Sequence, residues 1–222
     1  MTKLKISNLG IKFNLDKKRD RTLKNFLLNP FKHEKKKEFW AVRNIILELK
    51  AGDILGITGL NGSGKSTLLR AITGIYKPDE GHIESEGKIS LLAIGAGFEK
   101  ELTGIENIYL NGALFGFSRG KIDEILPKVL AFADIGDFIY QPIRTYSSGM
   151  ESRLGFAIAI NLNPDILLID EILAVGDAEF KDKCRNEIEK ILKDEQKIVL
   201  IVSHNLDLID KLCNRKFELI KR

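Results

Sequence analysis

The stretch from Gly59 to Ser66 constrains the fold of this 222-residue chain more than any other part of its sequence. It reads Gly-Leu-Asn-Gly-Ser-Gly-Lys-Ser and fits the pattern G-x-x-x-x-G-K-[ST]. Its glycines allow a tight turn that brings backbone N–H groups against phosphate oxygens. An apolar run at 53–58 precedes the loop, and a helical pattern at 66–72 follows it. The sequence therefore predicts a buried strand, a phosphate-binding loop and a helix whose N-terminus adds partial positive charge.

Two side chains of the loop have the chemistry that a nucleotide requires. Lys65 supplies a compact positive charge for the β- and γ-phosphates, and the Ser66 hydroxyl is a ligand for Mg²⁺. A glycine-rich turn would match the bare pattern by accident on the order of one time in a hundred in a chain of this length, and the strand–loop–helix context makes an accident rarer still. We therefore predict that nucleotide is bound by Gly59, Asn61, Gly62, Ser63, Gly64, Lys65, Ser66 and Thr67.

Composition and charge exclude few classes of protein. A hydrophobic content of 44% and a charged content of 30% are ordinary for a soluble globular protein, and the length suits one α/β domain spanning residues 1–222. The net charge of +4 is too small to argue for a nucleic-acid partner, and we expect none. Cys184 and Cys213 lack metal-binding spacing, which indicates reduced thiols. Because no signal peptide or membrane-length apolar run is found, we expect a soluble chain that reaches a membrane only through a partner or an interface.

A basic insertion at about 16–38 separates the opening strand at 4–9 from the strand at 45–49. It holds nine Lys and Arg residues against four acids, with apolar residues at near-helical spacing at Leu23, Phe26, Leu27 and Phe31. One interpretation is a solvated surface loop with a short helix. The other is an amphipathic element at an anionic membrane surface or against a membrane partner. The sequence leaves both open.

Phe39 and Trp40 come directly after this insertion. An aromatic ring here could stack on an adenine ring, and core packing is an equal alternative. Trp40 is our preferred stacking residue because it is the only Trp of the chain and starts the strand. Further along, 82–85 and 88–92 are typical of a hairpin. Helices are expected from 104 to about 133, with Pro127 in the first turn of one of them.

The run Ile166–Glu171 ends an apolar stretch with two acids, which is typical of a central parallel strand. Ligands of open α/β sheets lie at the carboxyl ends of the strands, so this end is expected beside the phosphate-binding loop. There Asp170 can hold Mg²⁺, and Glu171 can act as general base on the attacking water. A pair of acids in an ordinary loop is the alternative, which the neighbouring loop disfavours.

Two further motifs belong to the same site. Tyr146-Ser147-Ser148-Gly149-Met150 opens a helical pattern with hydroxyl and backbone donors for an anion, although alone it is only a weak N-cap signal. His204 follows the buried strand at 198–202. A lone His there is more often structural, but its place at a strand end favours contact with the phosphates.

These four motifs, in this order, resemble the ATP-binding cassette (ABC) family. The variant strings at 146–150, 95–98, 102–107 and 174–180 are similar to the ATPase subunits that export O-antigen, capsular polysaccharide or teichoic acid, and the similarity runs from about Leu4 to Ile220. The resemblance implies an α/β fold of the P-loop NTPase type, with a mixed sheet core, an antiparallel β subdomain and a helical subdomain at about 97–164.

The resemblance also implies a function. The chain would bind ATP and Mg²⁺ and hydrolyse ATP as a homodimer at the cytoplasmic face of the cell membrane, peripheral to a separate dimeric permease that exports a lipid-linked polysaccharide. Lys65, Glu171 and His204 would be catalytic, Ser66 and Asp170 would serve the metal, and Ser147 and Gly149 would complete the partner's site. The alternatives are a soluble cassette ATPase with a mechanical task and a P-loop kinase, and neither explains the variant strings.

The sequence departs from the family at two places. Most cassettes have a Gln before the segment that corresponds to Leu102-Thr103, where it contacts Mg²⁺ and senses the membrane subunit. Here Ile94-Gly95-Ala96-Gly97-Phe98 takes that place, and water is the simplest substitute ligand. Because the sequence stops soon after the last expected strand, we also expect no C-terminal glycan-binding domain.

Overall fold

Five parallel strands form the sheet that carries the predicted phosphate-binding loop. The computed structural model describes residues 2–15, 37–92, 97–170 and 178–220. Within them the parallel sheet has the order β5-β6-β7-β3-β8. Its strands are β3 (Ile54–Thr58), β5 (Ile89–Leu92), β6 (Ile166–Asp170), β7 (Ile198–Val202) and β8 (Arg215–Glu218). The side chains of β7 are all buried, as expected for a strand covered on both faces of its sheet.

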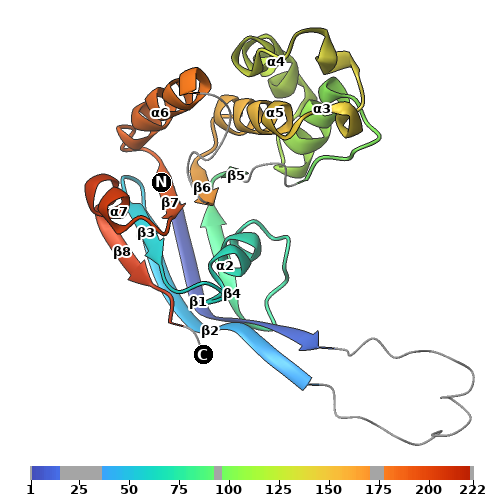
Figure 1. Ribbon diagram of the computed structural model, residues 1–222. Helices are drawn as coiled ribbons and strands as arrows, with labels where there is room; N and C mark the ends of the chain where they lie inside the picture. Colours follow the sequence, from blue (N-terminus) through green and yellow to red (C-terminus); the bar gives the residue numbers. More distant parts are fainter. Residues whose placement is uncertain (1, 16–36, 93–96, 171–177, 221–222) are drawn as a thin grey trace, which may run out of the picture.

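A second, antiparallel sheet contains β1 (Lys3–Leu15), β2 (Lys37–Lys50) and β4 (Glu80–Glu86) in the order β2-β1-β4. Its apolar face and the parallel sheet share one core, to which α2 (Lys65–Ile72) contributes Leu68, Leu69 and Ile72. Figure 1 shows α2 beside the strands of both sheets. The phosphate-binding loop therefore begins on one sheet and lies next to the other.

The remaining helices cover the other side of the parallel sheet and extend beyond it. α6 (Ala178–Leu192) and α7 (Leu206–Leu212) pack against β3, β6 and β7 in a core that includes Phe180 and Ile209. α3 (Gly104–Leu114), α4 (Arg119–Ala133), α5 (Ser148–Asn161) and the 3₁₀ turns η1 (Gly136–Tyr140) and η2 (Ile143–Thr145) surround a core of their own. Figure 1 shows these helices at one end of the molecule. No helix in the described ranges is both long and apolar enough to cross a bilayer.

The expected α/β class with parallel and antiparallel strands is confirmed, but the predicted hairpin is wrong. β4 pairs with β1, and β5 pairs in parallel with β6. The two strands join different sheets because the buried, apolar β5 belongs beside the apolar β6, whereas β4 is mostly exposed. Most of the basic insertion, 16–36, lies outside the described residues.

The placement of Pro127 is also corrected. α4 begins at Arg119, where the Ser118 side chain accepts a hydrogen bond from Lys121 N, so Pro127 lies in the interior of the helix. A proline there removes one intrahelical hydrogen bond. The helix is retained because Ile122, Ile125 and Val129 bury their side chains against the neighbouring helices. Tertiary packing outweighs the local cost.

Candidate functional site

The loop between β3 and α2 has a shape that only glycine permits at two positions. Gly59 has φ = 142° and Gly64 has φ = 99°, both in the left-handed region that L side chains rarely adopt. A side chain at Gly64 would collide with the carbonyl oxygen of Ala41 on β2, and one at Gly59 with that of Leu219 after β8. The loop is thus held between the edges of the two sheets.

The N-terminus of α2 has no side-chain cap. Gly64 occupies its N-cap position, and within the described part of the chain no side-chain cap accepts a hydrogen bond from the first turn of the helix. The other α-helices whose N-cap residues are described have such a cap, supplied by Thr103, Ser118, Ser147 and Asn205. The first N–H groups of a helix without an intrahelical partner attract anions. This N-terminus therefore has donors available for a phosphate.

Lys65 folds its side chain across the loop. Its Nζ donates to the carbonyl oxygens of Gly59 at 2.8 Å and Leu60 at 3.1 Å, and the residue is only 6% exposed. Ser63 is also buried, and its Oγ has no hydrogen-bond partner among the described residues. Ser66, Asn61 and Gly62 are exposed, and Thr67 is half-buried. The ammonium group therefore lies at the loop that the sequence assigns to phosphate.

Register places the ends of three neighbouring strands at one edge of the sheet. Asp170 on β6 pairs with Val202 on β7, and Val202 pairs with Ile57 on β3. Since adjacent strands lie about 4.8 Å apart, Asp170 lies about 10 Å across the sheet from the strand that carries the loop. His204 is exposed and lies two residues after the end of β7. Glu171 lies outside the described residues.

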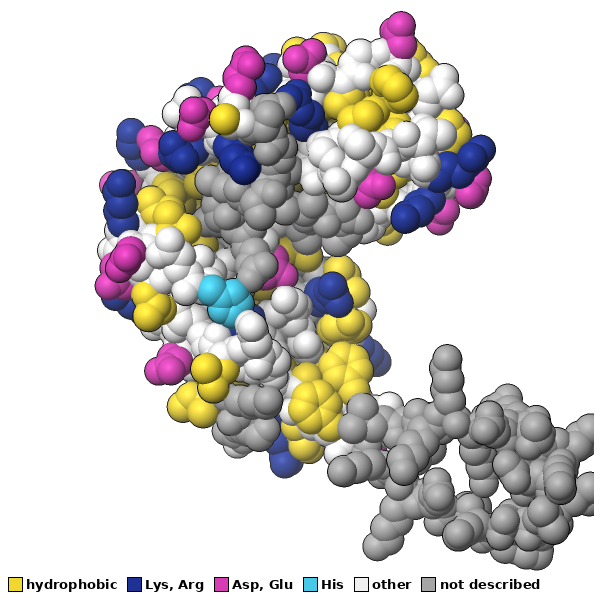
Figure 2. All heavy atoms as spheres, in the orientation of Figure 1, with side chains coloured by type: hydrophobic (Ala, Val, Ile, Leu, Met, Phe, Trp, Pro, Cys, Tyr) yellow, Lys and Arg dark blue, Asp and Glu magenta, His cyan; other side chains and the backbone are white. Residues whose placement is uncertain are grey.

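Ser147 and Gly149 lie at the start of α5. Ser147 is the N-cap, and its Oγ accepts a hydrogen bond from Met150 N at 3.2 Å. Figure 1 shows α5 within the helical end of the molecule, apart from α2. In Figure 2 the surface is hollowed between this end and the sheets. Within one chain, the structure does not bring these two residues to the phosphate-binding loop.

Trp40 lies on the face of the antiparallel sheet that points away from the core. It pairs with Lys12, its ring covers Gly10, and the Arg43 guanidinium lies 4.4 Å from the ring centroid. A register shift between Ile11 and Lys12, with Ala41 as the extra residue on β2, places Trp40 on this face, whereas Val42 stays in the core. The sequence alone does not reveal that bulge. Stacking of Trp40 on a base bound at α2 would require the opposite face.

Phe13 lies on the core face and was missed by the sequence analysis. It pairs with Phe39, and its ring meets Tyr76 edge-on at 5.4 Å, next to the end of α2. Phe39 is 40% exposed. Figure 2 shows hydrophobic side chains gathered at this end of β1 and β2. The alternation of Leu9, Ile11 and Phe13 along β1 was the signal that could have identified this residue.

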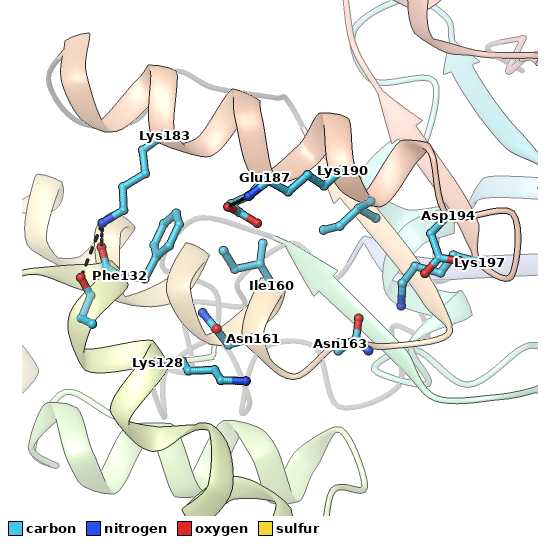
Figure 3. Close-up of a pocket in the computed structure, with 12 residues that line it drawn as sticks. Lys128, Phe132, Ile160, Asn161, Asn163, Lys183, Glu187, Lys190, Asp194 and Lys197 are labelled. Carbon is cyan, nitrogen blue, oxygen red and sulfur yellow. Dashed lines mark hydrogen bonds and ion pairs between the residues drawn. The ribbon is translucent and has the colours of Figure 1, made fainter.

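A cavity of about 570 Å³ lies elsewhere, between α4, α5 and α6 (Figure 3). Several of its lining ammonium groups already have partners. Lys183 Nζ donates to the carbonyl oxygen of Phe132, Lys190 pairs with Glu187, and Lys197 Nζ donates to Pro164 O. Burial lowers the pKa of Lys197. No residue of the loop or of the strand ends lines this cavity, so it is separate from the candidate site.

Residues 42–174, which include the loop and β6, match the family model described as ABC transporter. The chain belongs to this family. Solved structures agree on the fold. A dimeric ATP-binding cassette in a post-hydrolysis state bound to ADP and Pi has a TM-score of 0.72 and 22% identity, covering 97% of this chain and 94% of that one. The ATP-binding subunit of an ABC transporter also has a TM-score of 0.72, with 19% identity over 97% and 85% of the two chains.

Curated relatives of this ABC family chain carry the name teichoic acids export ATP-binding protein TagH. The Levilactobacillus brevis protein is 46% identical over 96% of this chain and 58% of its own length. The Bacillus anthracis protein is 44% identical over 96% of this chain and 38% of its own length. The Listeria innocua protein is 46% identical over 83% of this chain and 55% of its own length. The chain thus spans between about two fifths and three fifths of the length of the relatives reported.

Proposed function

We propose that this chain is the ATP-binding and ATP-hydrolysing subunit of an ABC transporter that exports a cell-surface polysaccharide of the teichoic acid, O-antigen or capsule type. One observation carries the ATPase proposal: an uncapped helix N-terminus and the Lys65 ammonium meet at one loop, in register with the end of β6. The export proposal is supported by the names of the relatives. Those names also favour export over a soluble mechanical ATPase.

The residues at the loop fit Mg²⁺ bound together with phosphate. Among the described residues no cluster of three or more His, Cys, Asp or Glu could hold a metal by itself. Mg²⁺ bound with a nucleotide needs only one or two protein oxygens besides phosphate and water. The Ser66 hydroxyl and the Asp170 carboxylate, directly or through water, are suitable. When bound, the ion neutralises charge that develops on the phosphates.

Each side chain has a role that follows from its chemistry. Lys65 releases its carbonyl contacts and attracts the β- and γ-phosphates, while the N–H groups at the start of α2 hold their oxygens. Glu171 accepts a proton from the attacking water. His204 contacts the γ-phosphate. Ser147 and Gly149 reach the same nucleotide from a second subunit, because they belong to the start of α5, which lies apart from α2 within one chain (Figure 1).

The adenine base of the nucleotide is proposed to stack on the aromatic side chains of the core face, with Phe13 in place of Trp40. Phe13 lies on the α2 side of the antiparallel sheet, and one side of the Trp40 ring is covered by Arg43. Loss of an aromatic stack of about 1 kcal/mol weakens binding several-fold. Phe13→Ala should therefore weaken ATP binding more than binding of inorganic tripolyphosphate, which has no base. Trp40→Ala is the matched control. If it weakened ATP binding more than Phe13→Ala does, Trp40 would be the stacking residue after all.

The proposed assembly is a homodimer that docks peripherally on a separate dimeric permease, at the cytoplasmic face of the membrane, with a lipid-linked glycan as the exported substrate. Its support is the dimeric cassette among the structural neighbours and the export names of the relatives. Co-purification from detergent-treated membranes tests it. Recovery of the chain without any multi-span partner would contradict the proposal.

The experiment that tests the ATPase proposal is the substitution Glu171→Gln. The amide keeps the shape and loses the basicity, so hydrolysis should fall about 10²–10⁴-fold while ATP binding persists. Hydrolysis is measured by phosphate release, and binding by equilibrium dialysis with ATP. Near-normal turnover of the purified variant would show that another group is the base.

A further inference from the structure

Asn107, in the first turn and a half of α3, is fully buried and uses its whole side-chain amide. Its Oδ1 accepts a hydrogen bond from Glu99 N at 2.8 Å. Its Nδ2 lies within hydrogen-bonding distance of the carbonyl oxygens of Glu99 at 3.0 Å, Leu102 at 3.1 Å and Thr103 at 2.9 Å. A buried amide with donors and acceptor engaged fixes the irregular segment 99–103 in one conformation.

Asn111, one turn later, extends the same arrangement. Its Nδ2 donates to Asn107 O at 3.0 Å and lies 3.5 Å from Gly97 O. The segment 97–103 is therefore held along one side of α3. Removal of the Asn107 amide would leave Glu99 N without its acceptor. It would also take one donor from the carbonyl oxygens of Glu99, Leu102 and Thr103, each of which keeps a backbone donor. The segment would then lose the hydrogen bonds that tie it to the side of α3.

Segment 99–103 in turn holds the chain that leads to α5. Ile143 N donates to Leu102 O at 3.0 Å, and Arg144 N donates to Lys100 O at 3.0 Å. The Arg144 side chain also pairs with Glu101, with Nε 3.2 Å from Oε2. Residues 142–144 thus take their position from the segment that Asn107 fixes.

Tyr146 connects residues 142–144 to the start of α5. Its N–H donates to Ile143 O at 2.9 Å, and its hydroxyl donates to Phe138 O at 2.8 Å. The side chain is packed so closely against Gly104 that any side chain at that position would collide with its hydroxyl. The next residue, Ser147, is the N-cap of α5.

We propose that Asn107 is a positioning residue that sets where Ser147 and the N-terminus of α5 stand relative to a nucleotide on the partner subunit. The inference rests on the proposed function, in which Ser147 acts across a dimer. Asn107 touches neither nucleotide nor Ser147. It acts through segment 99–103 and residues 142–146, each link of which is a backbone hydrogen bond or a buried contact.

A dimer with a single working site tests this inference. A Ser147→Arg subunit keeps its loop but cannot complete its partner's site, and a Lys65→Ala subunit does the reverse. Mixed together, they form one composite site from the first subunit's loop and the second subunit's Ser147. The Asn107→Ala change is then placed in one subunit or the other, and phosphate release is measured at matched concentrations.

The two placements have different expected results. Asn107→Ala in the Lys65→Ala subunit, which supplies Ser147, should lower hydrolysis about 10–100-fold, the scale expected of a misplacement by about 1 Å. The same change in the Ser147→Arg subunit should leave the activity of the mixture unchanged. The matched control is Asn161→Ala, because the one hydrogen bond that the Asn161 side chain makes within the described residues is to Ala157 O of its own helix. It should have no effect in either subunit.

Three outcomes would overturn a proposal, and they are distinguishable. If the mixture without any Asn107 change is inactive, the composite site itself is wrong. If that mixture is active and Asn107→Ala lowers activity equally in both placements, or in neither, then Asn107 does not position Ser147. Asn107→Asp, which keeps the shape and the acceptor for Glu99 N but loses the amide donors, repeats the test if the alanine variant unfolds. It should show the same dependence on placement.

Discussion

The N-termini of α2 and α5 both follow serine- and glycine-rich turns, yet they satisfy their first N–H groups differently. α2 begins after Gly64 with no side-chain cap, between the edges of two sheets. α5 begins after Ser147, whose hydroxyl caps the helix, at an exposed part of the helical end. The first is open to a ligand within its own chain. The second is capped by its own side chain, and its first residues, Ser147 and Ser148, are exposed.

This difference indicates how a composite site divides its work. The uncapped N-terminus depends on the surrounding sheets for its shape, so changes there affect folding as well as binding. The capped N-terminus has a side-chain acceptor for one of its first N–H groups, so changes there should affect the second subunit's nucleotide more than the fold. Substitutions at matched positions can separate the two.

Between the two helix N-termini, the largest effect on turnover is expected at Lys65. Lys65→Ala removes the positive charge at the loop, and loss of one preorganised electrostatic group typically lowers turnover about 10²–10³-fold. ATP hydrolysis by the purified chain is the measurement. Lys77→Ala is the control, because Lys77 is exposed and lies after the end of α2. Equal turnover of the two variants would remove Lys65 from the site.

The sharpest test of the comparison is the same change at the two glycines. Gly64→Ala forces a side chain into a left-handed backbone and against Ala41 O, so the free energy of unfolding should fall by about 1–3 kcal/mol or more. In Gly149→Ala, Ser147 Oγ at 3.7 Å is the one atom of the described residues near the new methyl group, and alanine favours a helix by about 1 kcal/mol. Denaturant unfolding should therefore show a stable Gly149→Ala variant, whereas its hydrolysis falls.

A stable, fully active Gly149→Ala variant would mean that the start of α5 has no role across a dimer. Conversely, a Gly64→Ala variant as stable as the parent chain would contradict the close approach of β2 to the loop. Either result would contradict the proposed difference between the N-termini of α2 and α5.

The smallest effect is expected at the cap of α5. Ser147→Ala removes the hydrogen bond from Met150 N and should lower the free energy of unfolding by about 1 kcal/mol. Ser147→Asp keeps a capping oxygen, so it should keep the stability. Its negative charge, however, should repel the partner's phosphates and lower hydrolysis. Ser148→Ala is the control for stability, and loss of stability in Ser147→Asp would show that the cap is not the cause.

The sequence alone determined the local parts of the site. The positions of Gly59–Ser66, Asp170 and Ser147 on a loop, a strand end and a helix start follow from short-range patterns, because a turn, a buried strand and an N-cap each depend on a few neighbouring residues. The order of those motifs also identified the family, which the family model confirms. The roles assigned to Glu171 and His204 stay predictions.

Only the tertiary structure decided the features that depend on pairing between distant segments. The separation of β4 from β5 depends on which strand each one joins. Just before β5, Lys88 N donates a hydrogen bond to Asp165 Oδ2 at 2.7 Å, across 77 residues of sequence. The bulge that puts Trp40 and Phe13 on opposite faces of the antiparallel sheet depends on the register between β1 and β2. A shift of one residue exchanges the two faces of a strand. The hydrogen bonds of Asn107 also depend on the tertiary structure, because the fold brings the carbonyl groups of segment 99–103 to its side-chain amide.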